Sequence, residues 1–163
     1  MKFLVDTNFL GTLVGICPPD IFPTLWSQLE TKLFREGVYF HEAVHDEQKA
    51  WKHPQSEWYL KHIGTEGILK SDADILAAYA DVSEWALERE KKQLSKSSAV
   101  DEFLNSADSW LVAAGVSKKA TIVTQEVRAP DARKRIKIPD VADAFGVPCI
   151  GLVEFLRALE IRV

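Results

Sequence analysis

The sequence predicts an α/β protein with three layers, in which helices cover both faces of a central, mainly parallel sheet. Short apolar segments alternate along the chain with longer segments whose apolar residues recur at helical spacing. Glycine, proline and capping residues separate these segments. Alternating strands and helices are typical of a parallel sheet with helices on both faces. The length of 163 residues fits one domain with a full core.

Local signals place each element in order. Four short segments are expected to be strands: residues 2–5, 38–40, 120–124 and 147–150. Eight segments are expected to be helices: from residue 9 to the break at 18–20, then about 21–33, 41–51, 55–63, 72–94, 106–116, 138–145 and 152–159. Ser71 or Asp72 is suited to cap the longest helix. Pro54 ends a helix, and Gly37 and Gly146 stand where helices stop.

The segment 54–99 is the part of the chain where the alternation breaks down. No strand is expected in it, and its residues are mainly of helical character. No internal repeat, low-complexity tract or linker is visible on either side. We therefore expect a single domain over residues 1–163, with about 54–99 as a helical insertion or arm within it.

Composition excludes several classes of protein. The apolar and charged fractions, 47% and 27%, are those of a globular chain. No apolar run reaches the roughly 20 residues of a membrane span. The N-terminal segment meets Asp6 too early for a signal peptide, so we expect a cytoplasmic protein without a membrane partner. Cys17 and Cys149 lack the spacing of a metal-binding pair and are expected to be free thiols.

Four acidic residues stand where strands give way to helices or near the start of a helix: Asp6, Glu47, Asp108 and Glu126. Asp6 and Glu126 follow expected strands. Asp108 lies in the first turn after Asn105 or Ser106, where the helix dipole favours a carboxylate. The ends of parallel strands and the starts of helices share one edge of a sheet. We therefore expect the four carboxylates to meet at that edge.

Two of these acids also interrupt apolar helical faces. Glu47 falls in the middle of a face formed, at about 100° per residue, by the apolar residues of its helix. These are Ala43, Val44, Ala50 and Trp51. Asp108 falls between Leu104 and Val112 on a similar stripe. Both carboxylates are therefore expected to point inward.

A cluster of buried carboxylates normally needs a cation, because the charges repel one another and lose hydration. A hard divalent ion held by carboxylates points to phosphate chemistry. Each acid also has an ordinary structural explanation, such as helix capping by Asp6 or a loop position for Glu126. Asp140 and Asp143, in a following helix, are alternatives to Glu126 as the fourth acid.

The chain resembles PIN-domain nucleases in motifs that follow one another over its whole length. The motifs are Val5-Asp6-Thr7-Asn8, the inward Glu47, Ala107-Asp108 with Trp110-Leu111-Val112-Ala113, and Val123-Thr124-Gln125-Glu126. The closing segments Ile138-Pro139-Asp140-Val141 and Gly146-Val147-Pro148-Cys149-Ile150 resemble the DUF4411 subgroup of small prokaryotic PIN proteins. The chain differs from the family in one respect. The family usually has Asp as its fourth acid, and Gln125-Glu126 occupies that place here.

This resemblance implies a metal-dependent ribonuclease that hydrolyses RNA phosphodiester bonds, the toxin of a type II toxin–antitoxin pair. Asp6, Glu47, Asp108 and Glu126 would be its catalytic residues and would hold Mg²⁺ or Mn²⁺. The partners implied are an RNA substrate and a protein antitoxin, with a homodimer as a further candidate assembly. The other class of function left open is a PIN fold that serves as a non-catalytic interaction module.

Several neighbouring residues are candidates for supporting roles. Thr7, Asn8 and Thr124 would orient ligands or water, although plain turn chemistry explains them equally well. Five cations follow Glu126 and are candidates for RNA phosphate contacts, with a solvated charged loop as the alternative. They are Arg128, Arg133, Lys134, Arg135 and Lys137. The aromatic residues Trp51, Trp58, Tyr59 and Trp85 lie in expected helices, where packing is the favoured explanation.

A competing motif, His41-Glu42-Ala43-Val44-His45, matches the H-E-x-x-H signature of zinc metallopeptidases. Such a site needs both histidines on an established helix and a third ligand. Here His41 directly follows an expected strand, so the helix has barely begun. The charged side chains of Asp46 and Glu47 also crowd His45. We therefore keep a zinc metallopeptidase only as the less favoured alternative.

Overall fold

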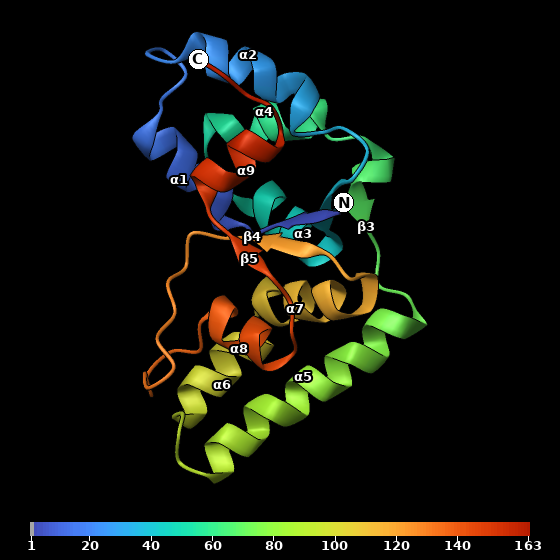
Figure 1. Cartoon of the computed structure of the whole chain (residues 1–163), viewed down its shortest axis with the longest axis vertical. Helices are drawn as coiled ribbons and strands as arrows, with labels where there is room; N and C mark the ends of the chain where they lie inside the picture. Colours follow the sequence, from blue (N-terminus) through green and yellow to red (C-terminus); the bar gives the residue numbers. More distant parts are fainter. Residues whose placement is uncertain (1) are drawn as a thin grey trace.

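The computed structural model describes residues 2–163 and contains a sheet of five parallel strands in the order β3-β2-β1-β4-β5. The strands are β1 (Phe3–Val5), β2 (Val38–His41), β3 (Ile68–Leu69), β4 (Thr121–Val123) and β5 (Cys149–Ile150). The first strand lies at the centre, between β2 and β4 (Figure 1). The switch in strand order therefore falls between β1 and β4, which is where open α/β sheets place their ligands.

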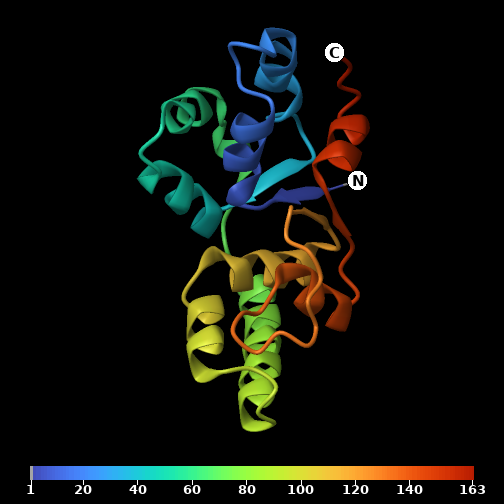
Figure 2. The same cartoon turned by 90° about the vertical axis from the view of Figure 1, so that its left-hand side faces the viewer.

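Helices cover both faces of this sheet. They are α1 (Asn8–Ile16), α2 (Pro23–Lys32), α3 (Glu42–Ala50), α4 (Pro54–His62), α5 (Ala73–Lys91), α6 (Ser97–Leu104), α7 (Ala107–Lys118), α8 (Ile138–Ala144) and α9 (Leu152–Ala158). Helices α1, α2, α4 and α9 lie on one side, and α5, α6, α7 and α8 lie on the other (Figures 1 and 2). The predicted three-layer α/β/α fold is confirmed.

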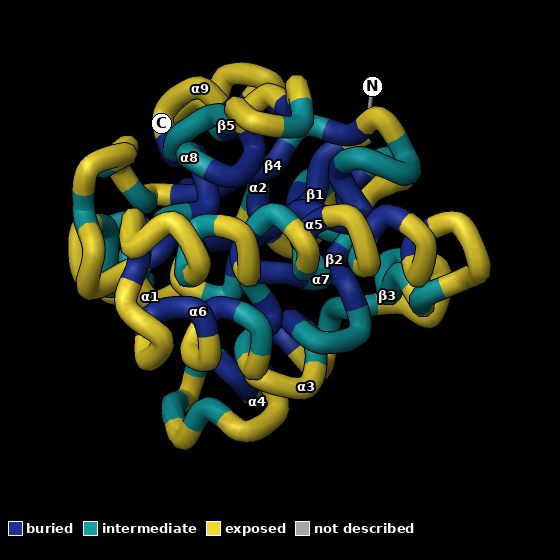
Figure 3. The backbone as a smooth tube through the Cα atoms, turned by 90° about the horizontal axis from the view of Figure 1, so that it is seen from below, coloured by how far each residue is buried: buried dark blue, intermediate teal, exposed yellow. Residues whose placement is uncertain are grey.

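The burial of the sheet explains why the strand sequences are continuous apolar runs and do not alternate between apolar and polar residues. Phe3, Leu4 and Val5 are all buried, because both faces of β1 are covered by helices. On one face, α7 packs against the sheet and α5 packs over α7. In Figure 3 the backbone of α7 is mostly buried, whereas the turns of α5 alternate between buried and exposed. Helix α7 is thus the buried inner helix of this layer.

The ends of the helices decide between the alternatives that the sequence left open. Asp72 caps α5, because its Oδ1 accepts a hydrogen bond of 2.9 Å from the backbone N–H of Ile75. Ser106 caps α7 in the same way, with its Oγ 3.3 Å from the backbone N of Asp108. Pro54 does more than stop a helix, since it is the first residue of α4.

Residues 54–99 contain two elements that the sequence did not predict. Strand β3 pairs in parallel with β2 and forms one edge of the sheet. It has only two residues and follows a single 3-10 turn at Thr65–Gly67, so it is too short to show a periodic pattern. Helix α6 begins at Ser97 within a polar stretch. This segment therefore supplies part of the sheet as well as the long helix α5.

Two further observations concern the expectations drawn from composition. Within residues 2–163, no helix is both long and apolar enough to cross a membrane. Cys17 and Cys149 are free thiols, as the sequence predicted.

The close approach of α7 to the sheet gives a test of the fold. A Cβ atom at Gly115 would lie 2.8 Å from Cγ1 of Val147 and 3.4 Å from the Ile122 side chain. We expect Gly115→Val to lower the free energy of unfolding by about 2 kcal/mol, because the helix must move away from packed β-branched side chains. Denaturant unfolding followed by circular dichroism measures this change.

The matched control is Gly15→Ala in the exposed part of α1, where an added Cβ meets no atom within 4 Å. It is expected to raise the free energy of unfolding by roughly 0.5–1 kcal/mol through helix propensity alone. Equal effects of the two substitutions would contradict the packing described for α7.

Candidate active site

Asp6 lies at the point where β1 ends and α1 begins, and its side chain is almost fully buried, with 1% exposure. Its backbone N–H donates to the carbonyl of Val123 at 2.9 Å, and its carbonyl accepts from the N–H of Phe9 at 3.1 Å. The residue is therefore held by the neighbouring strand on one side and by the first turn of the helix on the other.

The hydroxyl of Thr124 connects Asp6 to the end of the adjacent strand. It donates a hydrogen bond of 2.8 Å to Asp6 Oδ2 and accepts one of 3.1 Å from the backbone N–H of Glu126. Both groups lie beyond the carboxyl ends of β1 and β4, at the switch in strand order. Thr124 thereby holds the turn that carries Glu126 next to Asp6.

Glu47 reaches the same edge from α3, but its placement differs from the sequence prediction. The side chain that α3 buries beside Val44 is Gln48, at 1% exposure, whereas Glu47 is exposed. The predicted apolar face was wrong by one residue, because Ala50 is exposed and Trp51 already lies beyond the helix. Glu47 therefore faces the solvent side of the site, and its Oε2 accepts a hydrogen bond of 3.3 Å from Thr7 Oγ1.

Gln48 is a residue of this site that the sequence reasoning missed. Its Nε2 donates a hydrogen bond of 2.7 Å to the carbonyl of Thr7, which ties α3 to the turn that follows Asp6. The side chain of Thr7 makes no capping bond to α1 and contacts Glu47 instead. The only signal in the sequence was the spacing of four residues between Val44 and Gln48, which places both on one helical face.

Asp108 lies in the first turn of α7, immediately after the cap formed by Ser106. It is partly buried, and the helix dipole favours a negative charge at this end. Burial, together with the charges of Asp6, Glu126 and Glu47, nevertheless raises the pKa of Asp108 to about 8, against a lowering effect of Arg135. Asp108 is thus an acid whose charged form the surrounding protein disfavours.

The other two inner carboxylates are affected in the same direction. Burial raises the pKa of Asp6, and the charge of Glu47 adds to this, while the hydrogen bond from Thr124 opposes it. Burial and the charge of Asp6 raise the pKa of Glu126, against the lowering effect of Lys137 and Arg135. Asp6, Asp108 and Glu126 therefore lie close enough to repel one another, and the charge of Glu47 acts on Asp6 and Asp108.

The donor atoms of this cluster suit a hard divalent cation. Three carboxylate oxygens are buried without a hydrogen-bond partner: Asp6 Oδ1, Glu126 Oε1 and Glu126 Oε2. Unpartnered buried oxygens are costly unless a cation or water satisfies them. Within residues 2–163, no group of three or more acid, histidine or cysteine side chains is arranged so that it could hold a metal ion by itself. An ion bound here would therefore need water for most of its coordination, as Mg²⁺ commonly does.

The two alternatives for the fourth acid are occupied elsewhere. Both carboxylate oxygens of Asp140 accept from the backbone N–H of Ala129, at 3.2 and 3.0 Å. Asp143 forms a two-pronged ion pair with Arg128, with N–O distances of 2.7 and 2.9 Å. Both residues therefore hold the loop between β4 and α8, and the geometry favours Glu126 as the acid of the cluster.

The predicted cations divide into two groups. Arg128, Arg135 and Lys137 line a groove of about 780 Å³ that also contains Glu126. Arg135 is exposed and has only a long contact of 3.8 Å with Glu102. By contrast, Arg133 Nε donates to the carbonyl of Gln93 at 3.1 Å. Lys134 is exposed and does not contribute to the lining of this groove.

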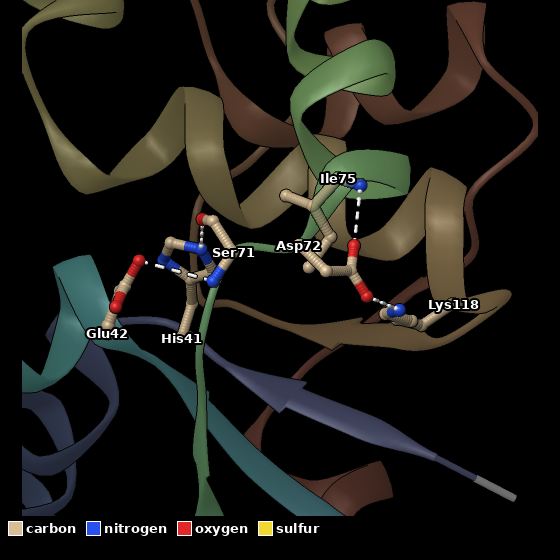
Figure 4. A network of polar contacts seen from close by, with 6 residues as sticks. All are labelled: His41, Glu42, Ser71, Asp72, Ile75 and Lys118. Carbon is tan, nitrogen blue, oxygen red and sulfur yellow. Dashed lines mark hydrogen bonds and ion pairs between the residues drawn. The ribbon is translucent and has the colours of Figure 1, made fainter.

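The H-E-x-x-H motif does not form a zinc site. His41 is the last residue of β2, and its Nδ1 accepts from the backbone N–H of Ala43 at 3.0 Å. Its Nε2 lies 2.8 Å from Ser71 Oγ, which joins the end of β2 to the start of α5 (Figure 4). The Nδ1 of His45 lies 2.9 Å from the hydroxyl of Tyr59. The two histidines thus serve different packing contacts, which supports the choice against a metallopeptidase.

Glu42, the middle residue of that motif, has a structural part as well. Its Oε1 accepts a hydrogen bond of 3.2 Å from the backbone N–H of Ser71. Next to it, Asp72 caps α5 and pairs with Lys118 at the end of α7 (Figure 4). This polar network connects β2, α5 and α7.

The chain thus combines a five-stranded parallel sheet with acidic side chains near its switch point. The chain belongs to the family described as Domain of unknown function (DUF4411), whose model matches residues 3–163. No curated protein matches the chain in sequence.

Solved structures with this fold include VapBC-1 from nontypeable Haemophilus influenzae, at 14% identity and a TM-score of 0.54. The likeness covers 93% of this chain and 98% of that chain. VapBC2 from Rickettsia felis, solved with a DNA fragment from their promoter, is similar at 14% identity and a TM-score of 0.50. It covers 93% of this chain and 99% of that chain. At such identities the likeness shows a shared fold.

The raised pKa of Asp108 predicts an unusual dependence of stability on pH. The folded state holds a proton up to about pH 8, whereas the unfolded chain loses it near the ordinary pKa of an aspartate, 3.8. Between these values the folded state binds more protons, so stability falls as pH rises, by at most about 1.4 kcal/mol per pH unit for one proton. Denaturant unfolding in EDTA at pH 5, 6, 7 and 8 measures this slope, which Asp108→Asn should reduce. A slope that Asp108→Asn leaves unchanged would assign the effect to another group.

Proposed function

We propose that this protein is a metal-dependent ribonuclease that hydrolyses RNA phosphodiester bonds, and that it acts as the toxin of a toxin–antitoxin pair. The observation that carries the proposal is the meeting of four carboxylates at the switch point of a parallel sheet. Two of them, Asp6 and Glu126, have buried oxygens without a partner. Such mutual repulsion destabilises the fold, and perturbed acids of this kind gather at functional sites, where a cation or a reaction makes use of them.

Asp6, Asp108 and Glu126 would hold Mg²⁺ or Mn²⁺ from the buried side, and Glu47 from the exposed side. When bound, the ion lowers the pKa of a water molecule and neutralises charge on the phosphate under attack. Thr124 fixes the position of the Asp6 carboxylate, and Thr7 orients Glu47 through its hydroxyl. The chain thus supplies an oriented set of oxygen ligands on rigid elements, open to solvent through Glu47.

The choice of a nucleic-acid substrate is supported by the groove beside the acids. Its cations, Arg128, Arg135 and Lys137, line the same groove as Glu126, whereas Glu47 lines a separate groove. A phosphate backbone in this groove would pair with the cations while one of its phosphates faced the acids. The net charge of −4 does not oppose this arrangement, because the local charge of the groove determines the contact.

The toxin role rests on the resemblance to PIN-domain toxins and on the fold shared with VapBC-1 and VapBC2. It implies that a protein antitoxin restrains the enzyme. A cytoplasmic location and a homodimer are parts of the same proposal. The competing function, a non-catalytic interaction module, would bind a divalent ion without cleaving any nucleic acid.

The first test is cleavage of labelled RNA by the purified chain with Mg²⁺, Mn²⁺, Zn²⁺ or EDTA. We expect cleavage with Mg²⁺ or Mn²⁺, and a loss of at least about a hundredfold in kcat for Asp6→Asn, because one ligand charge is removed. His45→Ala is the matched control, since among the proposed mechanisms only a zinc site would use its ring, and circular dichroism checks that loss of the contact with Tyr59 leaves the fold intact. Cleavage that survives EDTA or Asp6→Asn would refute the proposed mechanism.

A second comparison identifies the fourth acid. Glu126→Gln is expected to lower kcat by more than about tenfold, because its oxygens belong to the cluster. Asp140→Asn keeps an acceptor for the N–H of Ala129 and is expected to change kcat by less than about threefold. Steady-state cleavage rates at saturating RNA decide between them, and the reverse order would move the fourth role to Asp140.

A further inference from the structure

Two grooves meet on the first turns of α1, directly beside the acids. The aromatic groove, of about 380 Å³, runs between Glu47 and Trp51. The basic groove, of about 780 Å³, runs past Glu126 to Arg135 and Lys137. Asn8 and Gly11 line both grooves, so the two are joined along the surface of α1. Glu47 shares the aromatic groove with Trp51, and Glu126 shares the basic groove with the two cations.

Trp51 is placed differently from the other aromatic residues of this region. Trp58 packs against Trp26 and Phe34, with ring centroids 5.0 and 5.5 Å apart, and Tyr59 is fully buried. Trp51 follows the last residue of α3 and lines the aromatic groove. Trp51 packs against the core, as the sequence favoured for all of these residues, and it also lines the aromatic groove.

The indole ring of Trp51 is held in place before any ligand binds. It stacks on the ring of His53 with centroids 4.4 Å apart and planes inclined by 7°. His53 is itself fixed, because its Nδ1 accepts a hydrogen bond of 3.1 Å from the backbone N–H of Gln55 at the start of α4. A rigid aromatic ring at the side of a groove is the element on which proteins stack an unpaired base.

Gly11 keeps the join between the two grooves open. A Cβ at this position would lie 3.9 Å from Cζ2 of Trp51, so any longer side chain would fill the space between α1 and the indole. Gly15, one turn further along the same helix, has no atom within 4 Å of such a Cβ and does not line either groove. The two glycines thus differ only in their relation to the grooves.

We propose that the joined grooves bind single-stranded RNA, with one unpaired base stacked on Trp51 and the backbone of the following nucleotides beside Arg135 and Lys137. This inference rests on the proposed function, since the phosphate between the two subsites would then face the acids. Base-paired RNA does not fit the same role, because its bases are already stacked and present no free face to the indole. Stacking on the indole does not select among the four bases, since every base has an aromatic face.

Binding of a fluorescein-labelled RNA of 12 nucleotides to the full chain tests the proposal, in the Asp6→Asn background so that the RNA stays intact. Trp51→Ala should raise Kd about 5- to 150-fold, the loss expected for one base–aromatic stack, and Trp51→Phe should lose less. The same RNA as a duplex should show no effect of Trp51→Ala. A 2-aminopurine base in the single strand should be quenched on binding, and Trp51→Ala should abolish that quenching.

The glycine pair provides the matched control for a folding defect. Gly11→Leu should weaken single-strand binding by at least about fivefold, as the loss of one base stack would, whereas Gly15→Leu should leave Kd within twofold. Thermal unfolding of both variants reports whether they fold alike. Equal binding by the two glycine variants, or by Trp51→Ala and its parent, would overturn the stacking subsite.

The failure of this inference differs from the failure of the proposed function. Cleavage that needs Asp6 but shows the same KM in the native chain and in Trp51→Ala would refute the stacking subsite alone. Absence of both cleavage and single-strand binding in the native chain would refute the ribonuclease and the subsite together. Binding with 2-aminopurine quenching but without cleavage would retain the subsite and refute only the nuclease.

Discussion

Thr124 donates a hydrogen bond of 2.8 Å to Asp6 Oδ2 at the place where β1 and β4 end together. The bond orients the most buried carboxylate of the site, and the same hydroxyl receives the backbone N–H of Glu126. The parallel register of the two strands makes this hydrogen bond possible, since Val5 pairs with Val123 and both strands end at the same level. The positions of Asp6 and Glu126 therefore depend on this register, and α7 brings Asp108 to the same edge.

The site is held together against its own charge. Three carboxylates have a raised pKa because burial and mutual repulsion disfavour their ionised forms. The fold opposes this strain with neutral contacts, such as the Thr124 hydroxyl and the Gln48 amide, rather than with close ion pairs. Arg135 and Lys137 act only from a distance and remain available to a ligand. In such a centre a divalent ion would neutralise the repelling carboxylates, and an anionic backbone would pair with the available cations.

Most of the elements could be predicted from the sequence, because turns, caps and apolar runs are local signals. The failures concern features whose identity depends on neighbours. Strand β3 is defined by pairing with β2 and not by its own pattern. The sequence predicted Glu47 on the inner face of α3, whereas the structure buries its neighbour, the polar Gln48. The prediction relied on Ala50 and Trp51, but the helix ends at Ala50.

By itself the sequence determined the α/β class, the order of strands and helices, and the acids that stand at their junctions. These follow from hydrophobic periodicity and capping chemistry, which act over a few residues. Only the tertiary structure decided that Glu47 faces solvent, that Asp140 is bound to Ala129, and that two grooves join at Gly11. Those properties arise from contacts between segments far apart in the chain, and no local pattern specifies which side chain such contacts bury.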